Sequence, residues 1–296
     1  MNALPGMPWA LPWPFDRSYM QLALIAGVVV GATAPLIGAF VVQKGVSLIG
    51  DGLGHVAVAG IGAALLFDTS PTWTAMAFAV AAALVIEWLR ARGGTTGDLA
   101  LALVFYGGIA LGVVLASRSG TNTNLQPYLF GSILTATAND VWTVIALGVV
   151  IVIAVALTGR ALFAVVLDED AARVSGVPAG ALNVLLAVLT AITVVAAMRI
   201  VGVLLIAALM VLPVAASRLV ARSFRGTLLG AVAIGVSSAV LGLIAARVWA
   251  LAAGGAIVLV AALWFVLASI GAAVRRAGSP SGSAAPHHGS LVTGPH

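Results

Sequence analysis

The sequence predicts an all-α protein that crosses a membrane about nine times, and three observations support this fold class. Hydrophobic residues make up 62% of the 296 residues. Charged residues make up 8%, whereas soluble domains contain about 25%. The apolar residues occur in runs of about 20, the length of helix that spans the hydrocarbon core of a bilayer. Because no soluble core could enclose so much apolar surface, we expect lipid to surround these helices.

Nine apolar segments have the composition of transmembrane helices, although eight or ten spans also fit the pattern. They cover approximately residues 20–42, 46–67, 71–89, 98–116, 141–158, 180–198, 200–216, 227–246 and 254–272. The sixth and seventh segments are almost continuous, so the turn near Met198 and Arg199 is the hardest to place. We expect residues 1–19 to form a leader outside this transmembrane domain of residues 20–272. Residues 273–296, rich in Gly, Ser, Pro and His, are expected to be a disordered cytoplasmic tail.

Basic residues predict the orientation of the chain. With nine spans, ten of the 14 Lys and Arg residues fall on the side of the C-terminus and four on the other side. Because cytoplasmic loops carry an excess of Lys and Arg, we expect the C-terminus inside and the N-terminus outside. This rule also accounts for the net charge of +5. No nucleic-acid-binding module is recognisable, so nucleic acid is not an expected partner.

Two polar residues interrupt the second apolar segment. Asp51 and His55 lie in the stretch SLIGDGLGHVAVAG at residues 47–60. Positions i and i+4 share one face of a helix, and a carboxylate at bilayer depth costs roughly 2.5–3.5 kcal/mol, so such residues usually face a polar path or a partner. A carboxylate oxygen and an imidazole nitrogen suit Zn²⁺ or Mn²⁺. A proton relay and a structural Asp–His pair are the alternatives that the spacing leaves open.

Three further regions carry charge next to the apolar segments. Glu87 lies near the end of the third segment, where it completes a metal site or pairs with Arg90 or Arg92. Residues 168–178, DEDAARVSGVP, form a charged segment on the predicted inside. Residues 217–226, SRLVARSFRG, are expected to form a short basic helix on the same side. Solvated loops explain the last two segments, and a docking surface for a cytoplasmic partner is the functional alternative.

Motifs of several enzyme classes are missing from the sequence. It contains no G-x-x-x-x-G-K-[ST] phosphate-binding loop, no H-E-x-x-H and no G-x-S-x-G. Cysteine is absent, which excludes disulfides and thiol chemistry. We therefore expect a non-enzymatic protein without a permanently bound cofactor, which is not its own ATPase by that motif.

Four stretches in this order resemble the permease subunit of zinc/manganese-type metal-importing ABC transporters. They are VSLIGDGLGHVAVAGIG (46–62), PYLFGSILTATANDV (127–141), DEDAARVSGVP (168–178) and MRIVGVLLIAALMVLPVAASRLVAR (198–222). The resemblance implies the large-bundle ABC importer permease fold in a bacterial plasma (inner) membrane. It also implies a second permease copy, a cytoplasmic ATPase dimer and an extracytoplasmic metal-binding protein as partners.

The resemblance further implies roles for individual residues. Asp51 and His55 match the D-x-x-x-H stretch that holds the transported Zn²⁺ or Mn²⁺, with Fe²⁺ as a further option. The segment after Pro213 matches the coupling helix that docks on the ATPase. Its expected docking residues are Ser217, Arg218, Arg222 and Arg225.

Three other functions remain as alternatives at this point. A proton-coupled secondary transporter would use Asp51 and His55 as its relay. An ABC permease for a siderophore or cobalamin would keep the same scaffold. An intramembrane enzyme is disfavoured because no second cluster of metal ligands interrupts a span.

Overall fold

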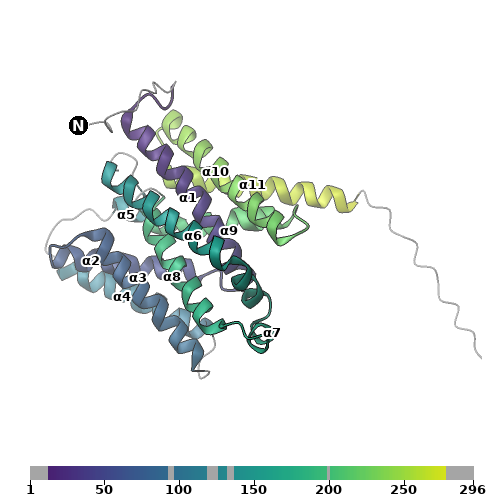
Figure 1. Ribbon diagram of the computed structural model, residues 1–296. Helices are drawn as coiled ribbons and strands as arrows, with labels where there is room; N and C mark the ends of the chain where they lie inside the picture. Colours follow the sequence, from purple (N-terminus) through teal and green to yellow (C-terminus); the bar gives the residue numbers. More distant parts are fainter. Residues whose placement is uncertain (1–12, 93–96, 119–125, 132–136, 199–200, 278–296) are drawn as a thin grey trace, which may run out of the picture.

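The computed structural model describes residues 13–92, 97–118, 126–131, 137–198 and 201–277, and all regular structure within these ranges is α-helical (Figure 1). These ranges contain nine long helices: α1 (Ser18–Gln43), α2 (Ile49–Leu66), α3 (Pro71–Ala91), α4 (Gly97–Arg118), α6 (Ala138–Leu167), α8 (Ala179–Ala197), α9 (Val203–Arg218), α10 (Phe224–Trp249) and α11 (Ala253–Ala277). Two short helices, α5 (Gln126–Phe130) and α7 (Glu169–Val174), lie between them. Each long helix covers one predicted apolar segment, so the predicted all-helical fold is confirmed.

Within the described residues, seven helices are long and apolar enough to cross a membrane. The other two predicted spans correspond to the shorter apolar helices within α4 and α9. The predicted turn near Met198 separates α8 from α9, and Gly202 begins α9 with φ +89°. A Cβ atom at Gly202 would lie 2.4 Å from the carbonyl carbon of Phe130, so this position requires glycine for both its dihedral and its contact.

Helix α1 forms the centre of the bundle and packs against α6, α8, α9 and α10 (Figure 1). Small residues allow these contacts to be close. A Cβ atom on Gly235 of α10 would come within 2.1 Å of the Gly31 carbonyl oxygen of α1, so the two backbones touch. Such contacts replace the hydrophobic driving force that is missing between helices in lipid. Although proline commonly kinks or breaks a helix, Pro35 and Pro213 lie inside the uninterrupted helices α1 and α9.

Helix α2 packs between α3, α4, α8 and α9. A Cβ atom on Gly54 would lie 2.9 Å from Val203 Cγ1 of α9, and one on Gly108 of α4 would lie 2.6 Å from Val56 Cγ2. These close approaches fix the rotation of α2 about its axis. They therefore determine where the polar side chains of α2 point.

The outer surface of the bundle is apolar, as expected for contact with lipid. Exposed side chains include Leu103 on α4, Leu157 on α6 and Leu229 on α10. Helix α11 is largely exposed and extends away from the other helices (Figure 1). It continues to Ala277, so residues 273–277 of the predicted tail are helical. The rest of that tail and residues 1–12 of the predicted leader lie outside the described residues.

The short basic helix predicted at residues 217–226 is not a separate helix in the structure, so this prediction of its secondary structure was wrong. Helix α9 ends at Arg218, and α10 begins at Phe224. A short turn joins them, and the Ser223 hydroxyl caps α10 by accepting a hydrogen bond from the Gly226 N–H at 3.1 Å. Because a serine in extended conformation at this position starts a new helix, the basic residues are divided between two spans.

Candidate functional site

The predicted pair of Asp51 and His55 lies on one face of α2, close to its N-terminal end. His55 Nε2 and Asp51 Oδ1 are 3.8 Å apart, which is too long for a hydrogen bond. The His55 ring packs edge-on against Phe105 of α4, with ring centroids 4.6 Å apart. The side chains of His55 and Asp51 are 20% and 32% exposed, respectively. Both polar groups are thus positioned by their surroundings and remain accessible to a small ligand.

A cavity of about 300 Å³ opens beside Asp51. Leu48, Leu101 and Tyr106 line it, together with Phe105, so α2 and α4 form its walls. Gly52 allows this arrangement, because a Cβ atom there would lie only 3.1 Å from Leu101 Cδ1. Among the described residues that line this cavity, Asp51 is the one carboxylate.

The chemistry of this pair suits a divalent transition metal ion. A carboxylate oxygen and an imidazole nitrogen bind such ions at about 2.0–2.2 Å, so a separation of 3.8 Å leaves room for an ion between them. Among the described residues, however, no group of three or more His, Cys, Asp and Glu side chains comes together. Among the described residues, this pair could offer such an ion at most two protein ligands, so a fuller coordination sphere would require water, another residue or a second copy of the chain.

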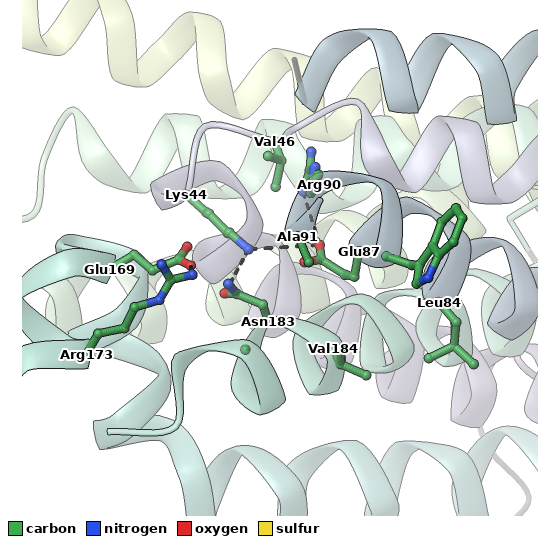
Figure 2. A pocket seen from close by; sticks show the side chains of 12 residues that line it. Lys44, Val46, Leu84, Glu87, Arg90, Ala91, Glu169, Arg173, Asn183 and Val184 are labelled. Atoms are coloured by element: carbon green, nitrogen blue, oxygen red, sulfur yellow. Dashed lines mark hydrogen bonds and ion pairs between the residues drawn. The ribbon is translucent and has the colours of Figure 1, made fainter. Parts of the chain in front are cut away.

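The structure does not bring Glu87 together with Asp51 and His55. Glu87 is buried on α3, where Arg90 Nη1 donates a hydrogen bond to its Oε1 at 3.1 Å (Figure 2). Lys44 Nζ lies 4.0 Å from the same oxygen. The alternative that paired Glu87 with Arg90 is thus confirmed, and its role as a metal ligand stays a prediction without support from this geometry.

Two members of this buried charged cluster, Lys44 and Asn183, are not predicted from the sequence. Lys44, at the C-terminal cap of α1, donates a hydrogen bond of 2.8 Å to Asn183 Oδ1 of α8 (Figure 2). Burial lowers the pKa of the Lys44 ammonium below its ordinary value, and the carboxylate of Glu87 counteracts this effect. Lys44 is the single lysine in the chain, and Asn183 interrupts an apolar run. These two signals were available in the sequence but did not reveal that the residues meet.

A cavity of about 590 Å³ lies next to this cluster. Glu169 and Arg173 of α7 line it together with Lys44, Glu87 and Asn183 (Figure 2). Asp168 is the N-cap of α7, and its side chain accepts a hydrogen bond from the Ala171 N–H. Segment 168–178 therefore forms a short, capped and charged helix that borders the same cavity as the charged cluster.

The four predicted docking residues lie in different settings. Ser217 is buried, and its hydroxyl donates a hydrogen bond of 2.9 Å to the Thr227 carbonyl oxygen of α10. Arg218, Arg222 and Arg225 are exposed, at the end of α9, in the turn and in the first turn of α10. Ser217 thus joins α9 to α10, and only the three arginines are accessible to a partner.

The fold and this pair of polar residues define the chain as a polytopic helical membrane protein with a candidate cation site next to α4. Comparison with known proteins then gives the family. The sequence profile of the ABC 3 transport family matches residues 16–272, and the chain belongs to this family.

Individual relatives agree with this assignment. The chain is 30% identical to the manganese import system permease protein ScaB of Streptococcus gordonii, over 85% of this chain and 91% of ScaB. It is 31% identical to the manganese transport system membrane protein MntC of Listeria monocytogenes, over 85% of this chain and 90% of MntC. A solved structure, PsaBC from Streptococcus pneumoniae in complex with Fab, matches with a TM-score of 0.76 and 30% identity, over 84% of this chain and 90% of that chain.

Proposed function

We propose that this protein is the membrane permease of an ATP-driven importer for a divalent transition metal ion, with manganese or zinc as the substrate. The observation that carries the proposal is the Asp51–His55 pair, half-buried on α2 beside a cavity. The relatives named as manganese permeases support the metal. Carboxylate ligands suit Mn²⁺, and imidazole suits Zn²⁺ and other transition metals, so the pair is compatible with both.

A second copy of the chain would complete the site. Two Asp51–His55 pairs facing a common axis would supply four protein ligands, while each chain alone supplies two. An ion on a transport path must bind well enough to enter and weakly enough to leave. A site divided between two copies meets this requirement, because a small movement of one copy changes the number of ligands.

Energy would come from a separate cytoplasmic ATPase, since the chain has no phosphate-binding loop. We infer that α7 docks on this ATPase, with the C-terminus of the chain on the same, cytoplasmic side. Helix α7 is short and mostly exposed, and its residues Glu169 and Arg173 border the cavity beside Lys44 and Glu87. A displacement of α7 would therefore be transmitted to the loop that connects α1 to α2. Through this loop it would also move α2, the helix that carries Asp51. Arg218 and Arg222 at the α9–α10 turn are additional docking candidates. An extracytoplasmic binding protein would deliver the ion to the opposite side.

The test is metal uptake by proteoliposomes that contain the permease, its ATPase and its binding protein. We expect ATP-dependent uptake of Mn²⁺ or Zn²⁺ by the wild type and loss of uptake in Asp51→Asn and His55→Ala, with unchanged binding of the ATPase. Asp68→Asn is the matched control, because Asp68 is an exposed carboxylate at the other end of α2, and asparagine also tolerates its φ of +50°.

Normal uptake by Asp51→Asn would exclude this residue as a metal ligand. Uptake that needs no ATPase and disappears when a protonophore collapses the proton gradient would instead favour a proton-coupled carrier with Asp51 and His55 as its relay.

A further inference from the structure

A groove of about 550 Å³ lies between the ends of α6 and α10 on the side predicted to be cytoplasmic. Phe40 of α1 is fully buried and forms its base. Phe163 of α6 and Phe224 of α10 form the sides. None of the described residues that line this groove also lines the cavity beside Asp51 or the one beside Lys44.

The interior of this groove is apolar and well ordered by ring contacts. The rings of Phe163 and Phe224 have centroids 4.4 Å apart, and those of Phe40 and Phe224 are 5.2 Å apart in an edge-on arrangement. Three aromatic rings from three helices thus form one continuous wall. Such a wall suits a hydrocarbon chain, because each buried CH₂ group contributes about 0.8 kcal/mol regardless of its orientation.

Two arginines from different helices stand at the mouth of the groove. Arg160 of α6 and Arg225 of α10 are both exposed and line it. Neither makes a hydrogen bond or an ion pair with any residue that the structure describes, whereas Arg90, Arg173 and Arg247 each contact a carboxylate. The N-terminal end of α10 adds partial positive charge at the same place. The groove therefore combines an apolar interior with unneutralised positive charge at its mouth.

The residues around the mouth of the groove indicate whether the groove opens toward lipid or toward water. Leu157, one turn before Arg160, is 80% exposed, and Leu229, one turn after Arg225, is 71% exposed. Both leucines lie on helices long and apolar enough to cross a membrane, so exposed leucines at these positions suit contact with hydrocarbon. The two arginines accordingly lie at the boundary between acyl chains and water, where lipid headgroups are found.

We propose that this groove binds an anionic phospholipid of the cytoplasmic leaflet. Its phosphate lies between Arg160 and Arg225, and one acyl chain lies along Phe40, Phe163 and Phe224. A bound lipid of this kind would bridge α6 and α10 on either side of the central helix α1. The chemistry is that of basic pockets between transmembrane helices, which select negatively charged headgroups.

The test is native mass spectrometry of the full-length protein with phosphatidylglycerol and phosphatidylcholine of identical acyl chains. We expect the wild type to retain phosphatidylglycerol in preference to phosphatidylcholine. Arg160→Gln/Arg225→Gln should weaken that binding by roughly 30-fold, since each basic residue near an anionic headgroup contributes roughly fivefold. The matched control is Arg92→Gln/Arg275→Gln, which removes the same charge from described arginines outside the groove and should leave the preference unchanged.

A second variant tests the apolar part of the groove without removing charge. Gly159 lines the groove, and a Cβ atom there would meet only Val155 Cγ1, at an ordinary 3.7 Å, so Gly159→Leu should fold and fill the space for the acyl chain. We expect this variant also to lose phosphatidylglycerol.

Four outcomes would overturn the proposal. They are unchanged binding in the arginine variant, an equal loss in its control, unchanged binding in Gly159→Leu, and displacement of the lipid by excess inorganic phosphate, which would indicate a site for a free anion. The first of these outcomes would reassign the groove to protein docking if the arginine variant, assayed in complex with the ATPase, also lost that subunit.

Discussion

Replacement of Glu87 by glutamine should reveal how much the buried charged cluster depends on its one central carboxylate. Glu87→Gln keeps the size of the side chain, so it creates no cavity. It leaves the Lys44 ammonium and the Arg90 guanidinium facing a neutral group. Breaking a buried ion pair costs about 3–5 kcal/mol. We expect the free energy of unfolding to fall by an amount near the lower end of this range. The reason is that the side chains of Lys44 and Arg90 are still 14% and 15% exposed, so water partly solvates their charges.

In the same cluster, we expect substitution of Lys44 to destabilise the protein less than substitution of Glu87. Lys44→Met should lower the free energy of unfolding by only about 1 kcal/mol, because it removes the hydrogen bond to Asn183 but leaves Glu87 paired with Arg90 at 3.1 Å. The double variant Lys44→Met/Glu87→Gln should be more stable than Glu87→Gln alone, since it removes one of the two uncompensated cations.

The measurement is unfolding of the purified protein in mixed micelles by increasing dodecyl sulfate, followed by tryptophan fluorescence. Trp88 lines the adjacent cavity and reports on this region. Asp170→Asn, a carboxylate whose side chain is 95% exposed, is the control and should not change the unfolding free energy. Equal losses in Lys44→Met and Glu87→Gln, or a loss in Glu87→Gln no larger than in the control, would refute the reasoning that Glu87 neutralises both cations.

Three further changes test the packing and the helix ends. Gly235→Ala should separate α1 from α10 and lower stability by about 1–3 kcal/mol, measured by the same unfolding assay, because its methyl group would overlap the Gly31 carbonyl oxygen. Ser217→Ala should cost about 1 kcal/mol by loss of its hydrogen bond to Thr227, yet should leave ATPase binding in a pull-down unchanged, since Ser217 is buried. Thr137→Ala should cost about 1 kcal/mol in unfolding free energy by removing the capping box of α6, and unchanged stability would contradict that role.

Composition and spacing were sufficient to predict the helices and the face that carries the polar pair. Apolar runs of about 20 residues specify spans because backbone polar groups in lipid must be satisfied within the helix. Asp51 and His55 share a face because they are four residues apart, a relation that holds in any regular helix. Both inferences depend only on local geometry, which the order of residues determines.

The remaining parts of the structure depend on which helices meet. Asn183 is far from Lys44 in the chain, and their hydrogen bond forms because α8 packs near the end of α1. The 217–226 segment has the composition of a basic helix, yet the packing of α9 against α10 through Ser217 makes it a turn. The groove beside Arg160 and Arg225 likewise exists only because α1, α6 and α10 come together.

The sequence by itself thus determined the helical membrane fold, the family resemblance and the residues proposed to bind the metal ion. Only the tertiary structure decided that Glu87 pairs with Lys44 and Arg90 rather than with Asp51 and His55. The physical reason is that a charged side chain reaches whichever opposite charge the packing of helices brings nearest. Which of the distant residues comes near depends on how α1 and α3 pack against α8, and no periodicity within a single helix encodes that packing.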